Sequence, residues 1–223
     1  MPSTPASVPG AAPLPTRLVD ATIALLATEG PGAVRAREVT TAVGASTMAV
    51  YQHFGGMPGL LRATSDEGFR RLGERLRDAP RSGDPVTDAY RLALVHRAVA
   101  LENPHLYDLM FGLSNPGRSR DGDGDGEDAP GPGFAAAYGQ LAALADALVE
   151  AGRVRPDDPH VIAAQLWSFA HGFITLELAG HMARFADSVE QVLLPLGANV
   201  MTGLGDDRDR AIASIAAALE PPR

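Results

Sequence analysis

The segment VGASTMAVYQHFGG, Val43 to Gly56, decides the fold of the N-terminal part of the chain. Gly44 lies between two short amphipathic stretches, where a tight turn needs a residue that tolerates a positive φ angle. Ser46 follows at the position from which a hydroxyl caps the next helix. Val50 and Phe54, four residues apart, give that helix an apolar face. The segment therefore predicts two short helices joined by a tight turn.

Two interpretations of this pair of helices fit the residue pattern equally well. In a helix-turn-helix, the second helix presents Thr47, Met48 and Tyr51 on its outward side, where they would face a nucleic acid. In a plain hairpin of two helices, the same side chains are ordinary surface residues. The pattern alone leaves both interpretations open.

The flanking sequence predicts helices almost throughout. Apolar residues recur at helical spacing, and no stretch shows the alternation typical of a strand, so the predicted fold class is all-α. Upstream of Pro80, which ends the last of them, the predicted helices cover about 14–29, 37–43 and 47–54, with a fourth that begins near Pro58.

In the second part of the chain, capping residues mark the predicted helix starts. In three places an aspartate or asparagine precedes a proline, which suits the first position of a helix because the N–H it lacks has no partner there. These pairs are Asp84–Pro85, Asn103–Pro104 and Asp158–Pro159. Ser188 with Gln191 has the spacing of a capping box, and Asp206 is placed to cap the last helix, 206–219. A long, mostly apolar helix is predicted for about 159–182.

Composition limits the classes of protein to consider. The chain has 223 residues, a formal net charge of -8 and 19 basic residues, all arginine, so any contact with nucleic acid must come from a local patch. It has no cysteine, which excludes disulfides and thiolate zinc sites. Residues 1–13 are proline-rich and are expected to form a disordered tail. With neither a signal peptide nor a run of about 20 apolar residues, the protein is expected in the cytoplasm, without a membrane partner.

No catalytic or metal-binding motif stands out. The six histidines never lie three or four residues apart, the spacing that brings two ligands to one helix face. The glycine- and aspartate-rich segment 114–133 is predicted to be a mobile loop. Asp121, Asp123 and Asp125 match the start of a calcium loop, but Pro132 occupies the position of its bidentate glutamate. We therefore expect no metal, no cofactor and no enzymatic activity.

Two longer segments resemble one known family. The segment from about Leu14 to Leu61 resembles the DNA-binding domain of TetR-family transcriptional regulators. The glycine turn and the Tyr-x-His-Phe signature lie in AREVTTAVGASTMAVYQHFGGMPGLL, Ala36 to Leu61. YRLALVHRAVALENPHLYDLMFG and LWSFAHGFITLELAG are similar to the C-terminal domain of the branch named for a tryptophan, a histidine and a glycine, here Trp167, His171 and Gly172. The resemblance favours the helix-turn-helix over the plain hairpin.

The resemblance implies a domain organisation and a function. It implies a three-helix DNA-binding domain at 14–62, joined by a fourth helix to an effector-binding and dimerisation domain within 63–223. The expected protein is a ligand-responsive regulator, a repressor that binds a near-palindromic operator as a homodimer and is released by a small-molecule effector. The long helices 159–182 and 206–219 are the candidates for the dimer interface, because both carry abundant apolar and alanine surface.

The resemblance also assigns DNA contacts residue by residue. The expected DNA-binding residues are Arg35, Arg37, Ser46, Thr47, Met48, Tyr51 and His53. Arginine, tyrosine and histidine side chains would contact phosphates, Ser46 would cap the reading helix, and Thr47 and Met48 would face the bases. With four arginines against three acidic residues, residues 14–62 carry a net charge of +1. Met57 departs from the family pattern, which often has a phosphate-binding lysine there, so N–H groups at the start of the fourth helix are expected to replace it.

The implied effector site is less specific. Aromatic residues with a few polar atoms are typical of ligand pockets, and the candidates are His96, Tyr107, Phe111, Trp167 and His171. Trp167 and His171 lie four residues apart, so they fit core packing at least as well as ligand contact. The alternative function is a helical small-molecule-binding protein that does not recognise DNA, favoured by Met57 and the low charge. A helical hydrolase would need convergent titratable groups that the sequence does not show.

Overall fold

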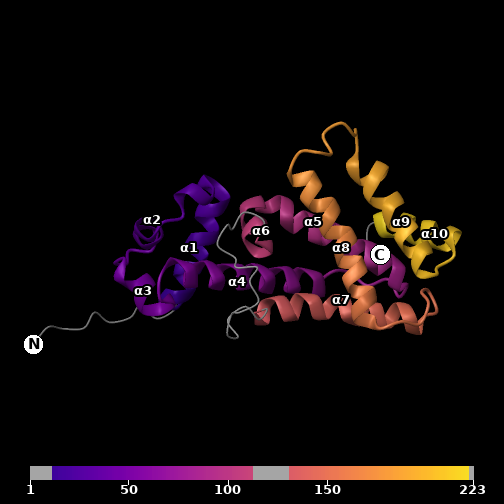
Figure 1. The fold of residues 1–223 in the computed structure, drawn as a ribbon, viewed down its shortest axis with the longest axis horizontal. Helices are drawn as coiled ribbons and strands as arrows, with labels where there is room; N and C mark the ends of the chain where they lie inside the picture. The colour runs from indigo at the N-terminus through magenta and orange to yellow at the C-terminus, as the bar shows by residue number, and fades with distance from the viewer. Residues whose placement is uncertain (1–11, 113–130, 221–223) are drawn as a thin grey trace, which may run out of the picture. The chain divides into compact units, whose positions relative to one another are not determined.

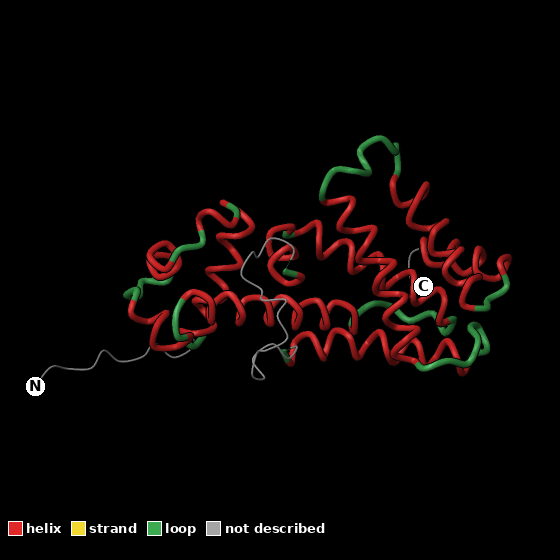
Figure 2. The backbone as a smooth tube through the Cα atoms, in the orientation of Figure 1, coloured by secondary structure: helices red, strands yellow, loops and turns green. Residues whose placement is uncertain are grey.

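The computed structural model describes residues 12–112 and 131–220, and every regular element within these ranges is helical (Figures 1 and 2). The α-helices are α1 Leu14–Glu29, α2 Ala36–Ala42, α3 Met48–Phe54, α4 Met57–Arg77, α5 Pro85–Glu102, α6 Pro104–Phe111, α7 Pro132–Glu150, α8 Pro159–Leu178, α9 Leu194–Leu204 and α10 Arg208–Leu219. A short 3₁₀ helix, Pro31–Ala33, follows α1, and a π-helical turn, Val189–Leu193, precedes α9. The all-α prediction is confirmed.

The chain divides into two compact units between Glu67 and Gly68, within α4. In the N-terminal unit, α1 contacts α2 and the 3₁₀ helix, and α2 contacts α3. The centre of this unit is apolar: Leu18, Val39, Val50 and Leu60 are fully buried. These positions follow the helical spacing of the sequence, so burial of one face of each short helix holds the unit together.

The turn between α2 and α3 forms as predicted. Gly44 has a φ angle of +67°, the left-handed conformation that a side chain disfavours. The guanidinium of Arg17 in α1 donates a 2.5 Å hydrogen bond to the carbonyl of Val43, satisfying one of the open acceptors at the end of α2. α1 thereby fixes the point at which the chain turns into α3.

A second glycine fixes the connection from α3 to α4. Gly59 lies in the first turn of α4, and a Cβ atom there would come within 1.8 Å of the carbonyl oxygen of Phe54, the last residue of α3. No pair of such atoms approaches so closely, because repulsion rises steeply well before that distance. Only glycine is therefore compatible with this junction.

Three of the predicted helix caps form. The side chains of Asp84, Asn103 and Asp158 accept hydrogen bonds from N–H groups in the first turns of α5, α6 and α8. Each is followed by proline at the first helical position, as expected.

Three other predicted caps are wrong. In two cases a neighbouring residue occupies the capping position, and in the third the side chain bonds elsewhere. Helix α3 begins at Met48 with Thr47 in the capping position, and Ser46 contributes only its carbonyl, which accepts from the N–H of Ala49. Ser188 instead donates a 2.5 Å bond to Glu177, and the preceding aspartate, Asp187, accepts from the turn. Asp207, not Asp206, caps α10.

Asp206 is instead part of a buried ionic network. Arg153, which follows α7, donates bonds of 2.9 and 2.7 Å to the two carboxylate oxygens of Asp206. It also pairs with Asp84, the cap of α5, and donates a 3.1 Å bond to the hydroxyl of Ser214 in α10. Arg153 is 4% exposed and Asp206 is 6% exposed. The guanidinium of Arg153 thus links the segment after α7 to the start of α5 and to α10 through hydrogen bonds.

In the C-terminal unit, α5, α7 and α9 lie around α8 (Figure 1). α8 contacts α5, α7 and α9, and α10 contacts α5 and α9. By length and composition, α8 alone among the described helices would be long and apolar enough to cross a membrane, so the expectation that no run approaches this length is wrong. Ile162, Phe173 and Ile174 on its inner side are almost fully buried, as in a core helix of a globular domain.

Two predicted segments fall largely outside the described residues. These are the tail, 1–13, and the loop, 114–133, with its calcium-like aspartates. The last three residues of that loop are described: Gly131 precedes α7, whereas Pro132 and Gly133 differ from the prediction because they begin this helix. Pro132 is compatible with the helix because the N–H group that proline lacks has no partner at the first helical position.

Candidate functional site

The predicted DNA-binding residues all lie on the surface of the N-terminal unit. Met48 and Tyr51 project from α3 with 58% and 61% of their surface exposed. The other members of the set, Arg35, Arg37, Ser46, Thr47 and His53, are also exposed. The opposite side of α3 carries Val50, which is fully buried. The arrangement is that of a reading helix whose outward face is free, and the individual contacts remain predictions.

Two residues of α3 change the expected reading surface. Ala49, the residue after Met48, is only 5% exposed and therefore faces the core. Gln52 is exposed one turn after Met48 and was not predicted. Its position four residues from Met48 was the available signal. A glutamine amide can bond both edge groups of adenine, so Gln52 is a stronger candidate for base recognition than a methionine thioether.

The start of α4 offers fewer donors than expected. The sequence predicts that main-chain N–H groups there replace a family lysine at Met57. Met57 is the first residue of α4 and Pro58, the second, has no N–H. An anion bound at this end of α4 could therefore accept hydrogen bonds from fewer main-chain N–H groups than the sequence predicts.

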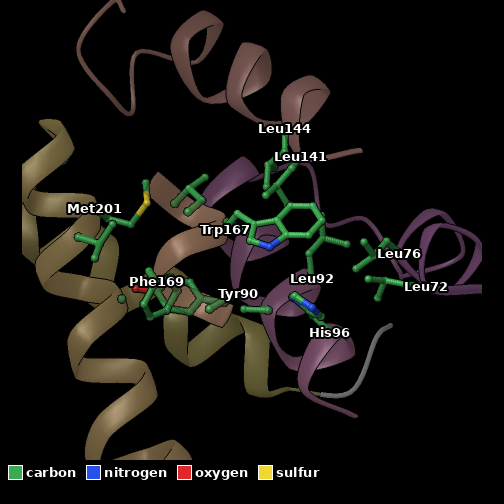
Figure 3. Close-up of a pocket in the computed structure, with 16 residues that line it drawn as sticks. Leu72, Leu76, Tyr90, Leu92, His96, Leu141, Leu144, Trp167, Phe169 and Met201 are labelled. Atoms are coloured by element: carbon green, nitrogen blue, oxygen red, sulfur yellow. The ribbon is translucent and has the colours of Figure 1, made fainter. Parts of the chain in front are cut away.

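The C-terminal unit contains a cavity of about 40 Å³ between α4, α5, α7, α8 and α9 (Figure 3). It is lined by Leu72, Leu76, Ala89, Tyr90, Leu92, Ala93, His96, Leu141, Leu144, Leu166, Trp167, Phe169, Ala170, Gly197, Val200 and Met201. Figure 3 shows the indole of Trp167 between Leu141 and Leu144 on one side and Tyr90, Leu92 and His96 on the other. The wall is apolar apart from three side chains, those of Tyr90, His96 and Trp167.

The structure brings the five predicted pocket residues into one aromatic cluster. Neighbouring rings lie 4.3 to 6.1 Å apart between centroids. The Tyr107 hydroxyl lies 2.7 Å from Nδ1 of His171 and 3.4 Å from Nε2 of His96, so it can donate to one ring and accept from the other. Only His96 and Trp167 line the cavity itself. Tyr107, Phe111 and His171 pack behind that wall, as the core-packing alternative for His171 expects.

Burial keeps this cluster uncharged at neutral pH. It lowers the pKa of His96 to about 3, with a smaller contribution from the nearby His171. Burial also lowers the pKa of His171 and raises that of the Tyr107 phenol. A neutral imidazole has one donor and one acceptor nitrogen, which suits a hydroxyl placed between two such rings.

The sequence did not predict Tyr90 as a pocket residue, although a signal for it was present. Tyr90, Ala93 and His96 follow one another at three-residue intervals in α5 and all line the cavity. Given His96 as a candidate, helical periodicity would have extended the pocket to Tyr90. Within residues 12–112 and 131–220, no three histidine, aspartate or glutamate side chains gather to hold a metal ion.

Acid is expected to destabilise the C-terminal unit through His96. The unfolded chain takes up a proton near the ordinary histidine pKa of about 6.5, whereas the folded protein does so only near 3. The free energy of unfolding therefore falls as the pH drops below about 6.5. Between pH 7 and pH 5 this histidine should remove on the order of 2 kcal/mol.

Urea unfolding at the two pH values, followed by the fluorescence of Trp167, measures this loss. His96→Leu should lose less stability between pH 7 and pH 5 than the wild type does. His105→Gln, a change at an exposed histidine of α6, should behave like the wild type. An equal acid-induced loss in His96→Leu and the wild type would show that His96 is not the cause.

Comparison with known families and structures gives a consistent result. The profile described as "Bacterial regulatory proteins, tetR family" matches residues 18–64, and "Tetracyclin repressor-like, C-terminal domain" matches residues 89–194. A protein of unknown function from Rhodococcus sp. RHA1 has a similar structure, with a TM-score of 0.68 and 22% identity over 89% of this chain and 98% of that one. No curated protein matches the sequence.

The protein RolR (NCGL1110) is also similar in structure. Without ligand, it gives a TM-score of 0.67 at 18% identity, covering 93% of this chain and 98% of RolR. In complex with resorcinol, it gives 0.62 at 18% identity, covering 94% and 96%. At these identities the similarity concerns the fold, and the two profile matches carry the assignment of family.

Proposed function

The chain belongs to the TetR family of transcriptional regulators, in the branch whose C-terminal domain carries a tryptophan, a histidine and a glycine. From this premise we propose that it is a cytoplasmic homodimeric repressor that binds a near-palindromic operator and leaves it when a small molecule binds the C-terminal unit. Residues 14–62 form the DNA-binding domain, and residues 63–223 form the effector-binding and dimerisation domain. The exposed outward face of α3 is the observation that carries the proposal.

The reading helix makes its DNA contacts mostly without charge. Tyr51 donates its hydroxyl to a phosphate, while Met48 and Gln52 face the base edges in the major groove. Charged contacts come from Arg35 and Arg37, which gives four arginines in a dimer. Each neutralised phosphate contributes about -0.9 to the slope of log K against log salt, so the expected slope is about -3 to -4.

The dimer forms through α8 and α9, which contact each other and both expose apolar side chains. Val161 and Leu176 on α8 and Leu196 on α9 are each more than 40% exposed. Gly172 is exposed, and a Cβ atom there would meet nothing within 4 Å, so another helix can approach this face of α8 closely. Helix α10, within the expected interface segment 206–219, also exposes apolar side chains, with Ile212 47% and Leu219 55% exposed, so it stays a candidate beside α9.

Effector binding acts on DNA through α4. This helix contributes Leu72 and Leu76 to the cavity wall, while its first residues, Met57 to Glu67, belong to the N-terminal unit. A ligand that widens the cavity pushes on one end of a helix whose other end carries the DNA-binding domain. The ligand-free and resorcinol-bound structures of RolR support a small molecule as the signal. A coupling free energy of about 1–3 kcal/mol suffices to release an operator.

A titration against the DNA upstream of the protein's own coding sequence tests the proposal. Fluorescence anisotropy at several salt concentrations should give two protomers per duplex and the slope stated above. Tyr51→Phe should weaken binding at least about tenfold and leave the slope unchanged, because it removes a hydrogen bond to phosphate without removing a charge. Arg37→Ala should make the slope shallower by about 2.

Tyr138→Phe is the matched control for the loss of a tyrosine hydroxyl. Tyr138 lies in the C-terminal unit, where its hydroxyl donates to the carbonyl of His160, so DNA binding should not change. Binding that is insensitive to salt, or equal in Tyr51→Phe and the wild type, contradicts the proposal. Absence of DNA binding together with ligand binding would favour a small-molecule-binding protein without DNA recognition.

A further inference from the structure

The Tyr90 hydroxyl is a buried polar group without a partner. Tyr90 is 3% exposed and lines the cavity, and its oxygen bonds to no group in the described part of the chain. The hydroxyl lies against Gly197 of α9, where a Cβ atom would come within 2.7 Å of the oxygen. A buried hydroxyl left unpaired is destabilising, so its retention calls for an explanation.

The other residues of the cavity wall limit the chemical class of a ligand that could accept a hydrogen bond from Tyr90. None of the 16 lining residues carries a charge at neutral pH, since His96 is the only titratable base among them and is neutral. Besides Tyr90, the polar groups are the His96 imidazole and the Trp167 indole N–H, which can only donate. Such a wall cannot compensate the desolvation of an ion. It offers hydrogen-bond donors in an otherwise apolar space.

We propose that the cavity binds an uncharged, mainly apolar molecule that carries one hydrogen-bond acceptor, and that Tyr90 donates the bond that selects it. This inference rests on the proposed function, because it specifies the effector of the same site. Carboxylates, phosphates and ammonium compounds are excluded as effectors, because no lining residue pairs with their charge.

The cavity is smaller than the ligand that we propose for it. At about 40 Å³ it holds roughly three water molecules, whereas an apolar cavity that binds benzene measures about 150 Å³. Binding of a single ring therefore requires the wall to open. Leucine side chains from α4 and α7, together with Met201 of α9, form much of the wall and can change rotamer more readily than the aromatic rings. Entry of the ligand thus requires these side chains to move away from the cavity.

Two isosteric probes test the acceptor. Anisole and ethylbenzene have nearly the same shape, but anisole carries an ether oxygen where ethylbenzene has a methylene group. Trp167 is the only tryptophan in the chain and lines the cavity, so its fluorescence reports binding directly. The wild type should bind anisole about three- to tenfold more tightly than ethylbenzene, the gain of one neutral hydrogen bond. Benzoate, the anionic probe, should not bind.

Tyr90→Phe separates recognition from packing. This variant should bind both probes with equal affinity, and ethylbenzene as tightly as the wild type does. It should fold at least as stably as the wild type, because it removes an unpaired buried hydroxyl. Tyr138→Phe also alters a ring beside Trp167, with 5.6 Å between centroids, but its hydroxyl is bonded outside the cavity. It should retain the preference for anisole.

Four results would overturn the inference: no saturable binding of either neutral probe, benzoate binding comparable with that of anisole, equal affinity for the two probes in the wild type, or an unchanged preference in Tyr90→Phe. None of these measurements involves DNA. If the probes bind as stated and the protein ignores its upstream DNA, the proposed function fails and the ligand class stands. If DNA binds and the probes do not, the ligand class fails alone.

Discussion

Gly59→Ala is expected to unfold the N-terminal unit and abolish DNA binding. The new methyl group would lie 1.8 Å from the carbonyl oxygen of Phe54, a main-chain atom that cannot rotate away as a side chain does. Relief requires a shift of the main chain where α3 joins α4. Overpacking of a core costs typically 1–3 kcal/mol and sometimes more, and a unit of this size has little stability to spare. We expect a loss of about 3 kcal/mol or more from the N-terminal unit.

Hydrogen exchange of the amides in α1, α2 and α3 measures this loss, and anisotropy measures DNA binding. The fluorescence of Trp167 should not change, because the tryptophan lies in the other unit. Gly32→Ala is the matched control: Gly32 is in the same unit, and a Cβ atom there would meet nothing within 4 Å. If Gly59→Ala kept the exchange protection and DNA affinity of Gly32→Ala, the close contact would not constrain the protein.

Arg153→Met is expected to destabilise the C-terminal unit by about 3–5 kcal/mol. The substitution keeps most of the buried volume but leaves the carboxylate of Asp206, which is 6% exposed, without its two hydrogen bonds from the guanidinium. It also removes the partner of Asp84, the cap of α5. Truncating one partner of a buried ion pair costs more than the pair contributes, because the other charge stays desolvated.

Urea unfolding followed by Trp167 fluorescence measures this change. Arg75→Ala is the comparison: it breaks an exposed pair with Glu102 on the surface and should cost less than about 1 kcal/mol. Arg153→Met combined with Asp206→Leu should recover part of the loss, since the uncompensated charge is then gone. Similar costs for Arg153→Met and Arg75→Ala would show that burial of the network adds nothing.

Much of the fold followed from local features of the sequence. Most helix starts, the left-handed Gly44 and three aspartate or asparagine caps depend on residues near one another in the chain, and these predictions are confirmed. The end predicted for the long helix 159–182 is wrong, because α8 ends at Leu178. Asp206 is a residue whose role local sequence features did not predict. It is adjacent to the true cap, Asp207, and nothing local distinguishes a capping carboxylate from one that meets an arginine 53 residues away.

In the candidate site, too, features that depend on nearby residues were predictable, whereas contacts between distant residues were not. Exposure of Met48 and Tyr51 agrees with helical spacing, which is a local property. The cavity is assembled from five helices, so the sequence identified aromatic residues that do cluster but did not determine which of them reach the cavity. Tyr107 is the clearest case: it was a pocket candidate by type, yet it is enclosed by His96 and His171.

The tryptophan, histidine and glycine of the branch signature lie on two sides of α8. Trp167 lines the cavity and His171 supports its wall, while Gly172 lies on the exposed side that we assign to the dimer. Substitutions on one side of this short segment can therefore alter the chemistry of the signal, and those on the other can alter which chains assemble. Paralogous regulators in one cell can thus acquire new inducers without forming mixed dimers, or stop cross-assembling while they keep a shared inducer.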